Sequence, residues 1–120
     1  MKRVCLLFFV LLLSACMSTE QQTAVTTQDW YKVGVIDGQL GHLEKTANEL
    51  VKVSTLTDSQ VLDYRRGYQD GNNEYCQLSN AYILGVTRKM YQGVCDERKD
   101  GWKFRENWLN GRHSTASGMM

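Results

Sequence analysis

One short pattern occurs twice in this chain and limits what the chain can fold into. The pattern is Tyr-x-x-Gly-x-x-Asp-Gly, and Tyr64 in the second copy follows Tyr31 in the first by 33 residues. The recurring residues are Tyr31, Gly34, Asp37 and Gly38, then Tyr64, Gly67, Asp70 and Gly71. Glycine inside a helix costs roughly 0.5–1 kcal/mol relative to alanine, so glycines at helical spacing need a reason. We predict two related helices whose backbones pack closely through these glycines.

Apolar residues recur at three- and four-residue steps from Trp30 to Leu50, which indicates one face of a helix. Asp29 is a suitable N-cap. We favour one continuous helix over this stretch, and the alternative is a helix and a turn that divide near Asp37-Gly38.

A second helix is predicted from the capping-box pattern that begins at Thr57, and a further helix is predicted over residues 96–110. Between them, residues Tyr82 to Met90 fit either a short helix or an extended segment. An aromatic-x-x-Gly pattern without the Asp-Gly part recurs at Tyr82/Gly85 and Trp108/Gly111. The predicted fold class is therefore mainly α, a small helical domain of two or three packed helices.

The N-terminus has the parts of a secretory signal: Lys2 and Arg3, an uncharged run over residues 4–13, and small residues after it. The run is about half the roughly 20 residues that a membrane-spanning helix needs. Residues 13–16, Leu-Ser-Ala-Cys, resemble the lipobox of bacterial lipoproteins. The resemblance implies cleavage before Cys16 and attachment of fatty acyl chains such as palmitate to that residue. The alternative is an ordinary signal peptide that contains a cysteine.

The expected organisation follows from this signal. Residues 1–15 are a cleaved signal peptide, 16–28 a lipidated cysteine and flexible tether, 29–111 the helical domain, and 112–120 a flexible tail. Residue 17 is Met rather than Asp, which by the sorting rule of enterobacteria-like lipoproteins implies the outer membrane, with the protein facing the periplasm.

The cysteines fit an oxidising compartment. Cys5 leaves with the signal and Cys16 carries lipid, so we expect a disulfide between Cys76 and Cys95. Closing a loop of about 20 residues stabilises a fold by roughly 3 kcal/mol. The alternatives for these two cysteines are metal ligation and a free thiol.

The net charge of the chain identifies no partner, but it argues against one class of partner. Without Lys2 and Arg3, the 14 basic side chains become 12 against 13 acidic ones, a net charge of about −1. Nucleic acid is therefore not an expected partner, because it requires clustered positive charge.

Three candidate sites arise from the residues. Asp37 and Asp70 occupy equivalent positions and, if they faced each other, could perform acid–base chemistry on a glycan. The alternative is that each pairs with a nearby cation or a helix end. His42 is the centre of a second candidate, for metal binding or catalysis, and a surface histidine is the default. Aromatic residues form the third, either a sugar-binding groove or core packing over glycines: Tyr31, Tyr64, Tyr68, Tyr82, Tyr91, Trp102 and Trp108.

The chain is also similar to a family of proteobacterial lipoproteins known as domain of unknown function 2799, over about residues 29–111. The similarity rests on the glycine patterns above and, most specifically, on Tyr75-Cys76 and the run Tyr91-Gln92-Gly93-Val94-Cys95. It implies a small, mainly helical envelope lipoprotein with Cys76 and Cys95 as its framework. It brings no catalytic residues, and the chain stops soon after Gly111, where family members often continue as a longer helix.

We therefore expect a non-catalytic outer-membrane lipoprotein with a structural or interaction role, and no metal or cofactor. Its expected partners are the membrane, through Cys16, and an envelope protein or peptidoglycan. The alternatives are a small peptidoglycan-active enzyme that uses Asp37 and Asp70, and a binder of cell-wall glycan or of a hydrophobic ligand.

Overall fold

A computed structural model describes residues 17–117 of the chain, so Cys16 lies outside the described residues. The described part is helical and contains no strand, which confirms the mainly α fold class. There are more helices in it than the two or three we predicted. They are α2 (Thr19–Thr26), α3 (Trp30–Gln39), α4 (Ala47–Val53), α5 (Asp58–Tyr75), α6 (Leu78–Val86) and α7 (Gly101–Ser117).

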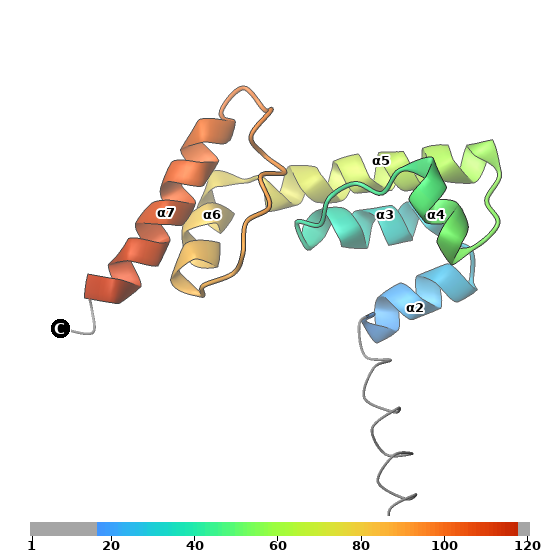
Figure 1. The fold of residues 1–120 in the computed structure, drawn as a ribbon, viewed down its shortest axis with the longest axis horizontal. Helices are drawn as coiled ribbons and strands as arrows, with labels where there is room; N and C mark the ends of the chain where they lie inside the picture. The colour runs from blue at the N-terminus through green and yellow to red at the C-terminus, as the bar shows by residue number, and fades with distance from the viewer. Residues whose placement is uncertain (1–16, 118–120) are drawn as a thin grey trace, which may run out of the picture.

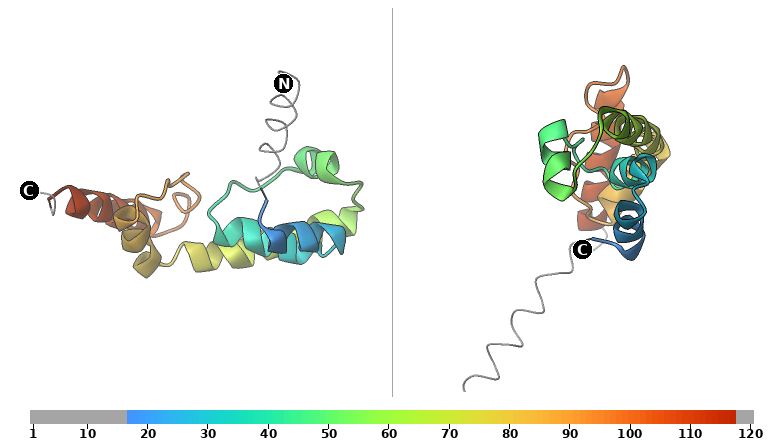
Figure 2. Two further views of the ribbon diagram at one scale, coloured as in Figure 1. Left: turned by 90° about the horizontal axis from the view of Figure 1, so that it is seen from below. Right: turned by 90° about the vertical axis from the view of Figure 1, so that its right-hand side faces the viewer.

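The architecture is two pairs of parallel helices (Figure 1). The long helix α5 belongs to the first pair, and its C-terminal end leads into the second. In the first pair, α3 and α5 run side by side in the same direction, and the chain returns between them through α4. In the second pair, α6 and α7 are also parallel and the segment 87–100 makes the return. Figure 2 shows the second pair at one end of the molecule, beyond the group formed by α2 to α5. Short loops join antiparallel helices, so each parallel pair needs its longer connection.

The α3–α5 pair packs through its glycines, as predicted. A methyl group added at Gly34 would lie 2.7 Å from the backbone nitrogen of Tyr68 and closer still to the Tyr64 carbonyl oxygen. A methyl group at Gly67 would lie 2.8 Å from the carbonyl carbon of Tyr31. Each glycine therefore faces the backbone of the partner helix at the residue that begins the partner's copy of the pattern.

The same contact recurs in the α6–α7 pair. An added methyl group at Gly85 would overlap the Trp108 carbonyl oxygen, and one at Gly111 would overlap the Tyr82 carbonyl oxygen. The shorter aromatic-x-x-Gly pattern thus marks a second parallel pair, which the sequence had not led us to expect.

The favoured continuous helix from Trp30 to Leu50 is wrong. Helix α3 ends at Gln39, and Gly41 follows with a φ of +70°, which glycine adopts without strain. His42 N–H donates to the Asp37 carbonyl and Gly41 N–H to the Gly38 carbonyl, both at 3.1 Å, which completes a Schellman motif. The chain then turns back before α4. The turn is at Gly41, three residues after Gly38, where the alternative placed the division.

The predicted flexible tether over 16–28 is also wrong for most of its length. Residues 19–26 form α2, with Ser18 as N-cap, although the segment has almost no amphipathic period. Gln21 and Ala24 are buried where α2 packs against α3, so tertiary contact selects the helix.

The C-terminal boundaries differ too. The last helix begins at Gly101 and runs through Ser117, rather than covering 96–110 and giving way to a flexible tail at 112. The segment that fitted either a short helix or an extended structure is divided. Residues 78–86 are helical, and residues 87–100 form the irregular return to α7.

Two hydrophobic clusters stabilise the molecule. The first lies among α2, α3, α4 and α5 and includes Trp30, Leu50 and Tyr64. The second surrounds Phe104 and Tyr91 near the second pair. Helix α5 contributes to both clusters, so it connects the two halves.

Candidate functional site

Asp37 is the most unusual polar residue among those described, because its carboxylate is completely buried. Its Oδ1 accepts hydrogen bonds from Gln21 Nε2 at 2.8 Å and from His42 Nδ1 at 3.3 Å. Its Oδ2 accepts from the Tyr64 hydroxyl at 2.9 Å and from Lys45 Nζ. A carboxylate has about four lone-pair positions, so these four donors use its accepting capacity.

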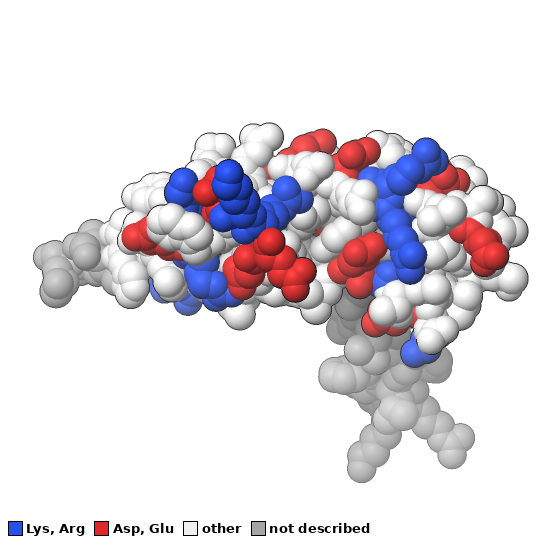
Figure 3. Space-filling view, turned by 90° about the horizontal axis from the view of Figure 1, so that it is seen from above, with Lys and Arg blue, Asp and Glu red and all other residues white. Residues whose placement is uncertain are grey.

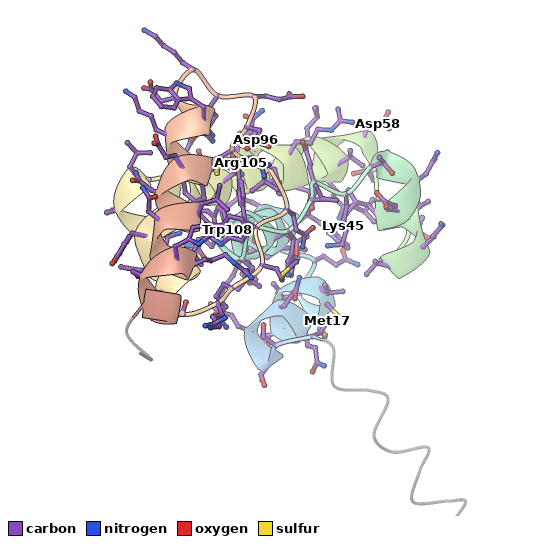
Figure 4. All side chains as sticks on the ribbon, turned by 60° about the vertical axis from the view of Figure 1, so that its left-hand side comes forward. Met17, Lys45, Asp58, Asp96, Arg105 and Trp108 are labelled. Atoms are coloured by element: carbon purple, nitrogen blue, oxygen red, sulfur yellow. A yellow bond between two sulfur atoms is a disulfide. The ribbon has the colours of Figure 1, made fainter. Side chains whose placement is uncertain are left out.

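Local folding explains why these donors meet. The turn at Gly41 reverses the chain directly after α3, which brings His42 and Lys45 back over the helix they follow. Parallel packing brings Tyr64 across from α5, and Gln21 comes from α2. Figure 4 shows Lys45 on the side of the molecule where Met17 and α2 lie.

The cluster places a fully buried carboxylate against partly exposed cationic and histidine side chains. Lys45 forms an ion pair with Asp37 and compensates its charge. Burial raises the pKa of Tyr64, and the neighbouring Asp37 carboxylate raises it further. The Tyr64 hydroxyl donates to Asp37 and accepts from the Lys45 backbone N–H at 3.1 Å. The hydroxyl therefore stays neutral and has protein partners both as a donor and as an acceptor.

Asp70 lies in a different environment. It is exposed, and it accepts a hydrogen bond from the Tyr31 hydroxyl at 2.7 Å. This contact is the counterpart of the Tyr64–Asp37 bond, since each tyrosine reaches across the helix pair to the aspartate of the other copy. The repeated pattern therefore encodes both a glycine contact and a cross-helix hydrogen bond.

The two aspartates have different surroundings because the pair is covered unequally. Helix α2 and the turn after α3 supply further donors to Asp37, while Asp70 stays at the surface. The two carboxylates share no hydrogen-bonding partner in the described network. The hypothesis of a catalytic aspartate pair thus lacks a shared site, and the alternative of separate partners for each aspartate describes the geometry.

The predicted disulfide is confirmed. Cys76 at the end of α5 is bonded to Cys95, with Cα atoms 5.6 Å apart, which excludes a free thiol or metal ligation at this pair. The bond fixes the return segment 87–100 against the first pair. In the described residues, no group of three or more His, Cys, Asp or Glu side chains could hold a metal ion.

A second polar network lies next to the disulfide. The Tyr91 hydroxyl accepts from Cys95 N–H at 3.0 Å and donates to Asp96 at 2.7 Å. Burial, aided by the hydrogen bond to Asp96, raises the pKa of Tyr91 to about 12. Arg105 forms an ion pair with Asp96 and so lowers the pKa of that carboxyl group (Figure 4). Sequence reasoning missed this network because Asp96 and Arg105 belong to no recognisable motif.

The aromatic residues divide between core and surface. Tyr64, Tyr68 and Tyr91 are buried, and Tyr64 and Tyr68 belong to the first cluster beside the glycine contact. Tyr31 and Trp102 are exposed, one in each helix pair. Core packing over glycines accounts for Tyr64 and Tyr68, and Tyr91 packs against Phe104 and Trp108 in the second cluster.

The surface carries mixed charge. Basic and acidic side chains are interspersed on the face shown in Figure 3. In residues 17–117, no helix has the length and apolar character required to cross a membrane.

Together these features define a class: a small, disulfide-bonded helical protein built on two glycine-packed parallel pairs. Residues 29–113 match the model of the family described as protein of unknown function DUF2799, and the chain belongs to this family. It is also 28% identical to the uncharacterized protein YfiL of Escherichia coli (strain K12) over 121 residues, covering 98% of this chain and 95% of that protein. No solved structure matches it.

Proposed function

We propose that this protein is a non-catalytic lipoprotein of the outer membrane that faces the periplasm and has a structural or interaction role there. Three features support the address: the positive and apolar N-terminus, the lipobox-like residues 13–16, and the disulfide in the folded part. The Cys76–Cys95 bond carries most of the argument, because stable disulfides belong to oxidising compartments such as the periplasm.

The arrangement of Asp37 supports a non-catalytic role. A general acid or base must exchange protons with a substrate. All four accepting positions of Asp37 are instead occupied by protein donors, and the carboxylate is inaccessible to solvent. The network therefore acts to hold α2, α3, α5 and the connecting turn together.

Two substitutions test the proposed anchoring. Cys16→Ser should move the protein out of the membrane fraction or block its processing, because it removes the lipid attachment site. Cys5→Ser is the matched control, since it changes a cysteine of the proposed signal and should leave membrane attachment unchanged. Normal processing and membrane fractionation of the Cys16→Ser protein would contradict the proposal.

Zymography tests the enzyme alternative. Purified protein should give no clearing of a peptidoglycan gel. Clearing that disappears in Asp37→Asn or Asp70→Asn would refute the non-catalytic assignment.

The proposed partner is another envelope protein or the peptidoglycan itself. Crosslinking in intact cells, followed by identification of the captured species, tests this part. Specific capture of a cytoplasmic protein or nucleic acid would contradict it.

A further inference from the structure

A pocket of about 220 Å³ lies among α2, α3 and the α4 region, close to the start of the described chain. Its wall is mostly apolar, with Val25, Trp30, Val33, Leu50 and Val53 among the lining residues. An apolar cavity of about 150 Å³ is large enough to bind benzene, so this pocket has room for a short stretch of hydrocarbon.

The polar groups of the pocket favour a neutral occupant with an oxygen acceptor. His42 and Lys45 line the pocket, and both already contact the Asp37 carboxylate, which leaves little positive charge for a second carboxylate. Trp30 also lines it, and its buried indole Nε1 has no hydrogen-bond partner among the described residues. Buried donors are normally satisfied, and the carbonyl oxygen of an amide supplies an acceptor.

The chain itself provides such a group at this place. Met17 lines the pocket and directly follows Cys16, and neighbouring Cα atoms are only about 3.8 Å apart. In the proposed lipoprotein, Cys16 carries an acyl chain on its amino group and a diacylglyceryl group on its sulfur. An attached chain has a high effective concentration at the pocket, which a free lipid lacks.

We propose that the amide-linked acyl chain of Cys16 enters this pocket with its first carbons, an inference that rests on the proposed lipidation. The two chains of the diacylglyceryl group stay in the bilayer, and two chains are enough for stable anchoring.

Photocrosslinking tests the proposal in the full-length lipoprotein. Cells are given a fatty acid with a diazirine group near its carboxyl end, which enters membrane lipids and then the acyl groups of lipoproteins. After irradiation, digestion and mass spectrometry should find the Cys16 acyl chain joined to residues of the pocket wall such as Val33 or Leu50.

A matched pair of variants sharpens the test. Val53→Arg places a long charged side chain at the pocket and should lower the yield of the internal crosslink at least five-fold. Val51→Arg changes the same residue type on the same helix, at 53% exposure against 47% for Val53, but Val51 does not line the pocket. Its yield should stay within two-fold of the parent protein.

The outcomes separate this inference from the proposed function. An acylated Cys16 whose photoproducts involve only surrounding phospholipid overturns the pocket proposal and leaves the lipoprotein assignment standing. An unacylated Cys16 overturns both. A crosslink to the pocket from a lipid that is not attached to Cys16 shows a different occupant and overturns the anchor assignment. Equal loss of the crosslink in both variants would also overturn the proposal.

Discussion

Gly67→Ala tests the close packing of α3 and α5. The added methyl group would lie 2.8 Å from the carbonyl carbon of Tyr31 and 3.0 Å from the backbone nitrogen of Val35, whereas ordinary contact begins near 3.4 Å. The neighbours are backbone atoms of a helix, so they cannot rotate away as a flexible side chain can. The Tyr31 carbonyl oxygen lies closer still, so the helices must separate by more than about 0.6 Å, the difference between 3.4 and 2.8 Å at the carbonyl carbon.

The expected cost follows from two opposing effects. Overpacking typically costs 1–3 kcal/mol, and a gap of 0.5–1 Å removes a quarter to a half of the dispersion attraction across the interface. Alanine returns about 1 kcal/mol through its higher helix propensity. Because the clash is with backbone atoms, the upper end of the overpacking range applies, about 3 kcal/mol, and the lost dispersion attraction adds to it. After the gain from alanine, we expect the free energy of unfolding to fall by about 2–3 kcal/mol, which lowers Tm by roughly 10–20 °C in a domain of this size.

Circular dichroism with thermal and urea unfolding measures this change. Gln69→Ala is the control, because Gln69 is exposed on the same helix and its replacement should alter stability by less than about 0.5 kcal/mol. Gly34→Ala combined with Gly67→Ala should cost less than the sum of the single changes, since the first substitution already separates the helices. A Gly67→Ala protein as stable as the parent would refute the predicted glycine contact.

Three further predictions concern the polar networks and the disulfide. Asp37→Asn should lower the free energy of unfolding in urea by roughly 2–3 kcal/mol because it breaks a buried ion pair, while Asp70→Asn should cost less than about 1 kcal/mol; equal costs would contradict the difference in burial. Reduction of the Cys76–Cys95 bond should cost about 3 kcal/mol, measured by urea unfolding with and without dithiothreitol, and an unchanged midpoint would count against its role. The raised pKa of Tyr91, about 12, means that its contribution is complete below pH 10 and is lost as the pH rises through 12. Urea midpoints should therefore fall between pH 10 and 12, less steeply in Tyr91→Phe, and a midpoint that rises over this range would contradict the assignment.

The sequence predicted the features that local chemistry determines. The glycine contact between the two copies of the pattern, the Asp29 N-cap and the capping box at Thr57 are all present. Each depends on a few residues at fixed spacing. The capping box formed by Thr46 and Glu49 likewise depends on two residues at a fixed spacing, and it could have revealed the start of α4.

The features that were missed depend on tertiary contacts. Helix α2 has little amphipathic character, and the burial of Gln21 against Asp37 becomes visible only when α3 and the following turn are in place. The unequal roles of Asp37 and Asp70 were likewise hidden, because the two copies of the pattern are alike in sequence and differ in what covers them. Parallel orientation was not predictable from periodicity, since an amphipathic face has no direction.

The intact mass of the protein extracted from the membrane fraction tests the central proposal most directly. We predict a chain that begins at Cys16 and carries the added mass of a diacylglyceryl group and one amide-linked acyl chain. A chain with no added lipid mass, or one that begins elsewhere, would contradict the lipoprotein assignment.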